Sequence, residues 1–412
     1  MNVSRNFLFA RSILFGAAAK IIGGAVVFLG LPLIANQLTV EEYSLFLRYM
    51  SWSSLILLIF GVAHLAATQV LASASQLQSA DATSDASNET LTFFFSLTIA
   101  AIAISVAFFM ITQDMIFLLV CALVTINGTA MWADAYRIAL RIDYKSSLVQ
   151  IISSTALLVA FIFFVGNSLV WTSIVYFGIP AITQLAIFLY EMKYICKRPM
   201  CRLSHAGLGR LYINSIPFVL NSSSEYMRVY GSSIVVWYFL GDAEYAKVSS
   251  EILIIARLIN PISLITRPLL PALIDAIASQ DQMWIAKFRA ALVILGISAI
   301  IVFFCLIFGP IYSVVRSIIP SIFYTMTYIE YYFLSSLICT YGIMALLLPV
   351  FQALGRIRLF VFVGALSNPP ASAAGIALLP YFGGGGMIIA LGTSSAASSL
   401  SMLAFAYFLL RR

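Results

Sequence analysis

An acidic and a basic side chain, Glu225 and Arg228, stand three residues apart shortly before the apolar run GSSIVVWYF. Residues three, four and seven positions apart share one face of a helix, and Asn221 falls on the face that Glu225 and Arg228 define. Arginine binds phosphate through two parallel hydrogen bonds. This polar stripe therefore predicts a binding site for a phosphate-bearing ligand. A structural ion pair between Glu225 and Arg228 is the alternative that the sequence leaves open.

Further basic residues interrupt other apolar stretches, and basic residues outnumber acidic ones there. Lys20 is flanked by Gly16, Gly23 and Gly24, whose small size leaves room for a ligand or for a close helix contact. An excess of buried positive charge suits an anionic head group such as a diphosphate. Together with the stripe, these positions give seven candidate substrate-binding residues: Lys20, Asn221, Glu225, Arg228, Arg257, Asn260 and Arg267.

Two other polar residues in apolar stretches, His64 and Asp134, are candidates for ion coupling. Histidine changes its charge near neutral pH, which suits a proton relay. A packing role for His64, and an ion pair of Asp134 with Arg137 or Arg141, are the structural alternatives. Cys196 and Cys201 have no histidine at zinc-finger spacing, so we expect no metal site.

The elements that carry these residues must be membrane-spanning helices. Of the 412 residues, 62% are hydrophobic and 9% are charged, whereas soluble domains carry about 25% charged residues. Runs of roughly 20 apolar residues are long enough to cross a bilayer as helices, and about twelve such runs follow one another along the chain by that criterion. The fold class predicted is therefore an all-α integral membrane protein. The pair of prolines in SNPPAS (367–372) predicts an interruption of the eleventh span.

The distribution of lysine and arginine predicts the orientation of the spans. Counted from a cytoplasmic N-terminus, most basic residues fall in the gaps on one side, which places both termini in the cytoplasm. This asymmetry accounts for the net charge of +7 without a nucleic-acid partner. The basic stretch 193–210 near the midpoint predicts a cytoplasmic linker between two six-helix bundles, 1–192 and 211–412.

The two halves of the chain also share a short pattern. LTVEEYS follows the first predicted span and LGDAEYA follows the seventh, so that Leu38, Glu42 and Tyr43 match Leu240, Glu244 and Tyr245 at a constant offset. Repeats that start on the same side of the membrane are typical of transporters with a site between two bundles.

With this repeat, the segments LPLIANQLTVEEYSLF and IPFVLNSSSEYMRVYGSSIVVWYFLGDAEYA resemble the polysaccharide transporter branch of the multidrug/oligosaccharidyl-lipid/polysaccharide (MOP) exporter superfamily. Within it, the length and the twelve spans resemble the Wzx-type O-antigen flippases. The resemblance implies a MATE-like fold and a multi-pass protein of the bacterial inner membrane that works without a cofactor. It further implies translocation of undecaprenyl-diphosphate-linked oligosaccharide by alternating access through a cationic cavity. A polysaccharide polymerase and a chain-length regulator are partners that the resemblance suggests.

Two rival functions predict sequence features that differ from those of a flippase. An ion-coupled MATE-like exporter of small cationic molecules predicts acidic residues in the central cavity, and the spans instead hold an excess of basic ones. A membrane-embedded polysaccharide polymerase needs a sizeable extramembrane loop, and no gap between predicted spans exceeds roughly 20 residues on the span-length criterion. The sequence also contains no P-loop, HExxH or GxSxG motif. We therefore expect a protein that is not an enzyme.

Overall fold

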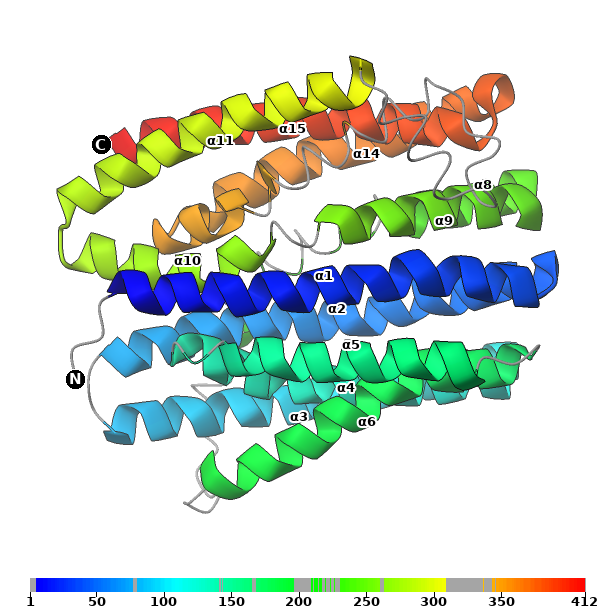
Figure 1. The fold of residues 1–412 in the computed structure, drawn as a ribbon, viewed down its shortest axis with the longest axis horizontal. Coiled ribbons are helices and arrows are strands. Elements are labelled where there is room, and N and C mark those ends of the chain that lie inside the picture. The colour runs from blue at the N-terminus through cyan, green and yellow to red at the C-terminus, as the bar shows by residue number, and fades with distance from the viewer. Residues whose placement is uncertain are drawn as a thin grey trace. The chain divides into compact units, whose positions relative to one another are not determined.

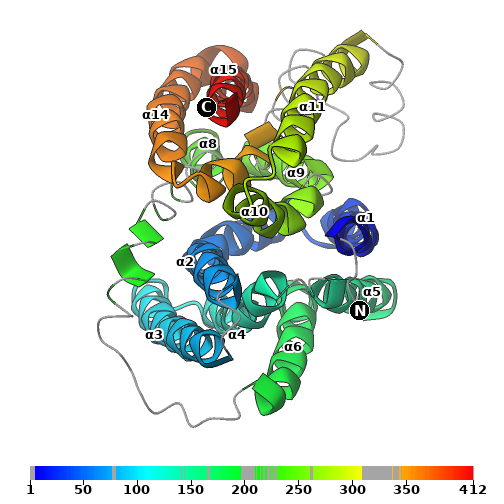
Figure 2. The ribbon, with the colours of Figure 1, turned by 90° about the vertical axis from the view of Figure 1, so that its left-hand side faces the viewer.

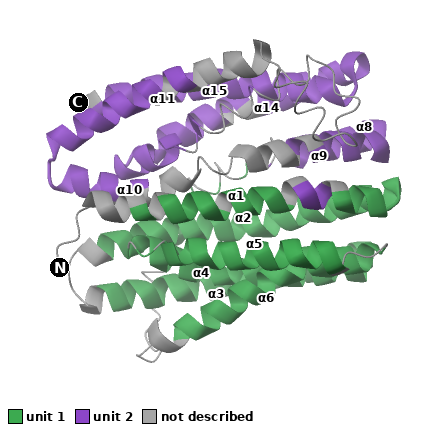
Figure 3. Ribbon diagram, in the orientation of Figure 1, with its two compact units in different colours: residues 1–26, 33–223 green, residues 27–32, 224–412 purple. Residues whose placement is uncertain are grey.

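The protein was analysed as a computed structural model that describes most of the chain. The described residues are 5–76, 80–140, 142, 144–164, 168–195, 209, 211–213, 215–216, 219, 223, 226, 230–259, 263–308, 336, 343–344 and 346–411. Within these ranges every regular element is a helix (Figure 1). Two compact units are present: residues 1–26 with 33–223, and residues 27–32 with 224–412 (Figure 3).

Unit 1 is a bundle of long helices. Its elements are α1 (Arg5–Gln37, of which 27–32 belong to unit 2), α2 (Val40–Gln76), α3 (Ala80–Thr112), α4 (Met115–Ala139), α5 (Tyr144–Phe164) and α6 (Leu169–Ile195). Helix α4 is central, because it packs against α2, α3 and α6.

The contact between α2 and α4 depends on a glycine. A Cβ atom on Gly128 of α4 would lie 2.1 Å from a ring carbon of Phe60 on α2, and Phe60 in turn lies 6.2 Å from Phe94 of α3 between ring centroids. Only a residue without a side chain allows the two backbones to approach this closely. The glycine therefore fixes the level at which α2 meets α4.

The turn between α3 and α4 is closed by polar contacts. The Asp114 carboxylate accepts hydrogen bonds from the N–H groups of Ile116 and Phe117, which caps the first turn of α4. The hydroxyl of Tyr49 on α2 donates to the same carboxylate. The residue that caps α4 thus also links it to α2 through a hydrogen bond.

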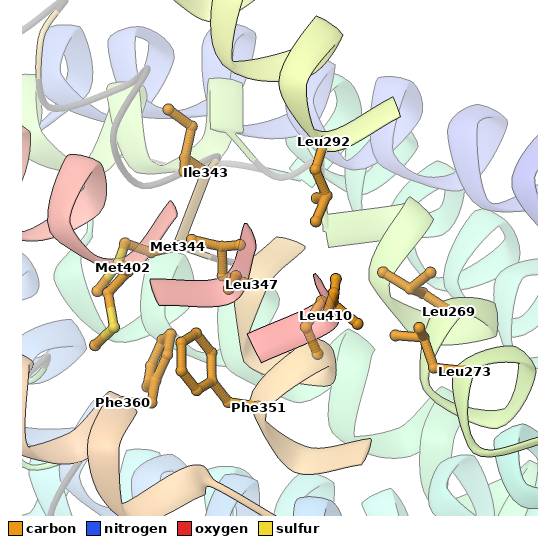
Figure 4. Packing of buried hydrophobic residues seen from close by; sticks show 12 residues of the cluster. Leu269, Leu273, Leu292, Ile343, Met344, Leu347, Phe351, Phe360, Met402 and Leu410 are labelled. Atoms are coloured by element: carbon orange, nitrogen blue, oxygen red, sulfur yellow. The ribbon is translucent and has the colours of Figure 1, made fainter. Parts of the chain in front are cut away.

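Unit 2 is also helical in its described residues. Its elements are α8 (Ser232–Leu240), α9 (Asp242–Ile259), α10 (Ser263–Ala278), α11 (Gln282–Phe308), α14 (Ile357–Phe382) and α15 (Gly384–Arg411). A buried apolar cluster joins α10, α11, α14 and α15 around Phe351 and Phe360, whose ring centroids are 5.6 Å apart (Figure 4). This cluster is the core of the unit.

The prediction that SNPPAS interrupts a span is wrong. Helix α14 runs without a break from Ile357 to Phe382 with Pro369, Pro370 and Pro380 inside it. It packs along its length against α15, and the hydroxyl of Ser394 on α15 donates to the carbonyl of Ser367 at 2.7 Å. Contact with the neighbouring helix therefore keeps the proline-containing segment helical.

The all-α membrane fold class is confirmed within the described ranges, where eight helices are long and apolar enough to cross a membrane. Several of the remaining predicted spans overlap residues outside those ranges, so the number twelve stays a prediction. The cytoplasmic location of the termini and the domain boundaries at 192/193 and 210/211 also stay predictions.

Candidate functional site

The predicted substrate-binding residues fall largely outside the described part of the chain. Asn221, Glu225, Arg228 and Asn260 lie outside the described residues. For three others the backbone is described but the side chain is not: Lys20 on α1, Arg257 on α9 and Arg267 on α10. The cationic cavity that these residues predict therefore remains a prediction.

The two predicted ion-coupling residues meet between α2 and α4. Nε2 of His64 lies 3.2 Å from Oδ2 of Asp134. The His64 and Asp134 side chains are 15% and 19% exposed, so the pair is mostly buried but not fully closed off from its surroundings. The packing of Phe60 against Gly128 lies one turn before His64 on α2, and it holds α2 and α4 at the distance that this contact requires.

Two small neighbours flank His64 on its own helix. The hydroxyl of Thr68, one turn further on, donates to the carbonyl of His64 at 2.7 Å, which satisfies the hydroxyl within α2. A Cβ atom on Gly61, three residues before His64, would meet no atom within 4 Å. Open space therefore adjoins α2 at Gly61, one turn before the histidine.

Histidine and aspartate are both side chain types that can carry a proton. A neutral imidazole shares a hydrogen bond with the carboxylate, whereas a protonated one forms an ion pair with it. The imidazole belongs to α2 and the carboxylate belongs to α4. Protonation therefore changes the strength of the contact between two helices.

A second ion pair joins α4 to α6, and the sequence analysis missed it. Nε of Arg137 donates to both carboxylate oxygens of Glu191, and its NH2 group donates to Oε2 at 2.6 Å. The guanidinium is only 2% exposed. Its NH1 group also donates to the Ser146 hydroxyl of α5 at 3.4 Å. Removing one partner of a buried pair leaves an uncompensated charge and costs about 3–5 kcal/mol, so we expect either single change to destabilise unit 1.

The Arg137–Glu191 contact also corrects one alternative for Asp134. The sequence offers Arg137, three residues after Asp134 on α4, as one partner of Asp134, but the guanidinium is bound to Glu191. Arg141, the other alternative, lies outside the described residues. The sequence did hold a signal, because Arg137 and Glu191 are opposite charges at the ends of neighbouring spans.

Helices α3 and α4 are joined by neutral hydrogen bonds. The hydroxyls of Thr98 and Thr129 lie 2.8 Å apart, and the indole N–H of Trp132 donates to the Thr90 hydroxyl at 3.1 Å. These bonds satisfy polar groups in the interior of the bundle. They leave α3 and α4 as one hairpin against which α2 packs.

A metal centre is not found among the described residues, because no three histidine, cysteine, aspartate or glutamate side chains come together there. Cys121 is buried as a free thiol. The His64–Asp134 contact is therefore the candidate site that the described part of unit 1 offers.

Comparison with known proteins identifies the fold. No protein-family model and no curated protein sequence matches the chain. An outward-facing multidrug resistance MATE family transporter of the MOP superfamily matches with a TM-score of 0.71 at 13% identity, over 99% of this chain and 96% of that one. The Vibrio cholerae MATE transporter VcmN matches with a TM-score of 0.69 at 13% identity, over 99% of both chains. The eukaryotic MATE transporter AtDTX14 gives 0.66 at 15% identity, over 99% of this chain and 97% of that one.

These likenesses confirm the MATE-like part of the predicted fold class over the whole chain. The chain is a multi-pass helical membrane protein, and its structural neighbours are transporters of the MOP superfamily. At this level of identity the comparison defines the fold, and the function follows only as a proposal.

Proposed function

We propose that the chain is an ion-coupled exporter that works by alternating access and takes up its coupling proton at His64 and Asp134. The observation that carries this proposal is the His64–Asp134 contact at 3.2 Å between α2 and α4. The full-length likeness to MATE transporters supports export as the direction of transport.

The physical basis is a differential affinity. A coupling ion shifts a transporter between two conformations only as far as it binds one of them more tightly. The imidazole and the carboxylate stand on different helices, so a conformation that separates α2 from α4 at this level loses proton affinity. Proton binding would then favour the conformation in which the two helices touch.

The test uses everted membrane vesicles that contain the full chain and a cationic dye such as ethidium. We expect dye uptake driven by an imposed pH gradient, and we expect His64→Gln and Asp134→Asn to reduce it to the level of vesicles without the protein. His205→Gln is the matched control, because it removes the only other histidine. Undiminished, pH-driven uptake by a well-expressed Asp134→Asn protein would remove the pair from coupling.

A second candidate function is the flipping of undecaprenyl-diphosphate-linked oligosaccharide across the bacterial inner membrane. It is favoured by the excess of basic residues in the predicted spans, where Lys20, Arg228, Arg257 and Arg267 stand against Asp134 and Glu225. A diphosphate head group is bound by arginine and lysine, whereas a small cationic molecule is repelled by them. A polysaccharide polymerase and a chain-length regulator would be its partners.

Complementation separates the two candidates. A bacterial strain that lacks its O-antigen flippase regains surface polysaccharide if the chain is a flippase of matching substrate range, and Lys20→Arg retains more of that activity than Lys20→Glu. Dye export without complementation in strains of several O-antigen types favours the exporter. Full complementation by a well-expressed Lys20→Glu protein would contradict the cationic cavity.

The Glu225–Arg228 stripe gives a sharper test of the same candidate. If Arg228 binds diphosphate, Arg228→Ala stops flipping without lowering the amount of protein in the membrane, and Arg228→Lys retains part of the activity because the charge remains. If the two residues are a structural pair, each single change lowers protein abundance, and the double exchange Glu225→Arg with Arg228→Glu restores it. Membrane abundance and surface polysaccharide are measured together for each variant.

A further inference from the structure

We propose that one end of unit 2 binds anionic phospholipid through a cluster of four basic side chains, Lys287, Arg289, Arg356 and Arg358, which we call the basic end patch. Lys287 and Arg289 belong to the second turn of α11, and Arg356 and Arg358 flank the start of α14. The proposal is independent of what the protein exports.

The starts of α11 and α14 are far apart in sequence, but both pack against the same buried apolar cluster. Trp284 and Phe288 of α11, and Ile357 and Leu359 of α14, pack against the buried cluster that includes Leu410 of α15. The turn from α10 to α11, the start of α14 and the C-terminal end of α15 accordingly lie at the same end of unit 2 (Figures 1 and 2). The basic residues alternate with the cluster-facing residues in both segments.

The basic side chains lie on the side of these segments that faces away from the buried apolar cluster. Lys287, Arg356 and Arg358 are exposed, and Arg289 is half-buried. Two acidic side chains are described near the α10–α11 turn. Asp281 accepts the Trp284 N–H at 3.0 Å and so caps α11, and Asp275 stands one turn before the end of α10. Among the described residues at this end, positive charge therefore exceeds negative charge.

The position of the patch selects lipid as the occupant. Arg356 and Arg358 stand at the first turn of a helix that is long and apolar enough to span the membrane. The charge distribution predicts that this end of the chain is cytoplasmic. Basic residues beside spans on that side attract anionic lipid head groups. The exposed side chain of Met283, in the first turn of α11, supplies an apolar contact for acyl chains.

The arrangement goes beyond what a topological signal requires. A topological signal needs only lysine or arginine near the ends of spans, wherever each lies on the surface. Here the basic residues of two segments that are distant in sequence, the starts of α11 and α14, lie beside the same buried apolar cluster. Asp281 already places a carboxylate at the N-terminus of α11, but α14 has no acidic residue in its first turn and no side-chain cap, although acidic residues are favoured there by the helix dipole. A bound phosphate group would supply the missing negative charge at the start of α14.

The test is lipid binding to the purified full-length chain in neutral detergent. Cardiolipin and phosphatidylglycerol are compared with phosphatidylcholine and with inorganic phosphate by native mass spectrometry and by the shift of the thermal unfolding midpoint. We expect the anionic lipids to bind and stabilise the protein, and we expect phosphatidylcholine and inorganic phosphate to have little effect. Each basic residue near an anionic head group strengthens binding by about fivefold.

The variants localise that binding to the patch. Arg356→Gln with Arg358→Gln should weaken cardiolipin binding by about 25-fold on the same scale, whereas Arg356→Lys with Arg358→Lys should retain most of it. Lys145→Gln, which removes an exposed charge at the start of α5 in unit 1, is the control and should change binding by less than about twofold, because it lies outside the patch.

Three outcomes would overturn the proposal. They are equal stabilisation by phosphatidylcholine, equal stabilisation by inorganic phosphate, and unchanged cardiolipin binding in the double glutamine variant. If that variant does not fold, salt dependence of the unaltered protein decides. Binding through exposed charges must weaken as the screening length falls from about 10 Å at 0.1 M salt to about 3 Å at 1 M, and salt-independent binding would contradict it.

Discussion

The turn before α2 (38–44) and the turn before α9 (240–246) carry the same sequence pattern, but the matching residues make different contacts. We call these two turns the corners. In the first corner, the Thr39 N–H donates to Glu42 Oε2 at 3.1 Å and the Glu42 N–H donates to Thr39 Oγ1 at 3.2 Å. This reciprocal pair is a capping box. In the second corner the residue that corresponds to Thr39 is Gly241, with φ of 85°, and it has no side chain with which to cap α9.

Glu244, the counterpart of Glu42, lies near another part of unit 2. Its Oε2 lies 3.1 Å from the position that a Cβ atom on Gly384 would occupy, at the turn from α14 to α15. Both corners nevertheless keep the backbone bond from the tyrosine N–H to the carbonyl four residues earlier, at 2.8 Å for Tyr43 and 3.1 Å for Tyr245. The shared pattern thus preserves the shape of the corner, while the role of the carboxylate has diverged.

The largest loss of stability is expected where the start of α15 packs against α9. A Cβ atom on Gly384 would lie 2.3 Å from Cγ2 of Val248 on α9. Gly384→Val should therefore lower the free energy of unfolding by about 3 kcal/mol, the upper range for overpacking. The measurement is thermal unfolding of the purified protein in detergent. Gly178→Ala is the control, because its Cβ would make only ordinary contacts, at 3.8 Å from Leu123; equal stability of both variants would refute the packing role.

Restoring the capping-box residues in unit 2 should fail. Gly241 has φ of 85° and ψ of −171°, a combination that is essentially restricted to glycine and costs other residues about 1–3 kcal/mol. Gly241→Thr should accordingly destabilise the protein by about 2 kcal/mol, although it recreates the spacing of Thr39 and Glu42. The reciprocal Thr39→Gly should cost only about 0.3 kcal/mol. A stabilised Gly241→Thr protein would mean that the two corners are interchangeable.

The cap of α2 should have a moderate effect. Thr39→Ala removes the hydroxyl that accepts the Glu42 N–H, and loss of such a cap costs about 1 kcal/mol. Thr39→Ser keeps the hydroxyl and serves as the control, with unfolding close to that of the unaltered protein. Equal stability of the alanine and serine variants would show that the capping box contributes nothing.

The smallest effect is expected from removing charge alone. Glu42→Gln keeps a hydrogen-bond acceptor but loses the interaction of a carboxylate with the helix N-terminus, which is about 0.5 kcal/mol at low salt. The difference from the unaltered protein should shrink as salt is raised, because the interaction is screened. A difference that persists at 1 M salt would assign the effect to hydrogen bonding instead.

The sequence was most informative where physics is local. Long apolar runs predicted spanning helices, and the all-α fold is confirmed within the described ranges. The prolines of SNPPAS were misread, because the support that keeps α14 helical comes from α15. The contact of His64 with Asp134 could not be derived from the sequence, since the two residues stand on different helices and only the packing brings them together. For Arg137, the opposite charge of Glu191 at the end of a neighbouring span was the signal that sequence reasoning missed.

The tight pairing of α14 with α15 has a consequence for how the chain is made. Gly375 and Gly386 allow close contacts with Met387 and Leu378 across the turn, so these contacts join residues that are near in sequence. Local contacts form quickly, and the pair needs no earlier part of the chain to recognise its own partner. We expect α14 and α15 to enter the bilayer together as one helical hairpin.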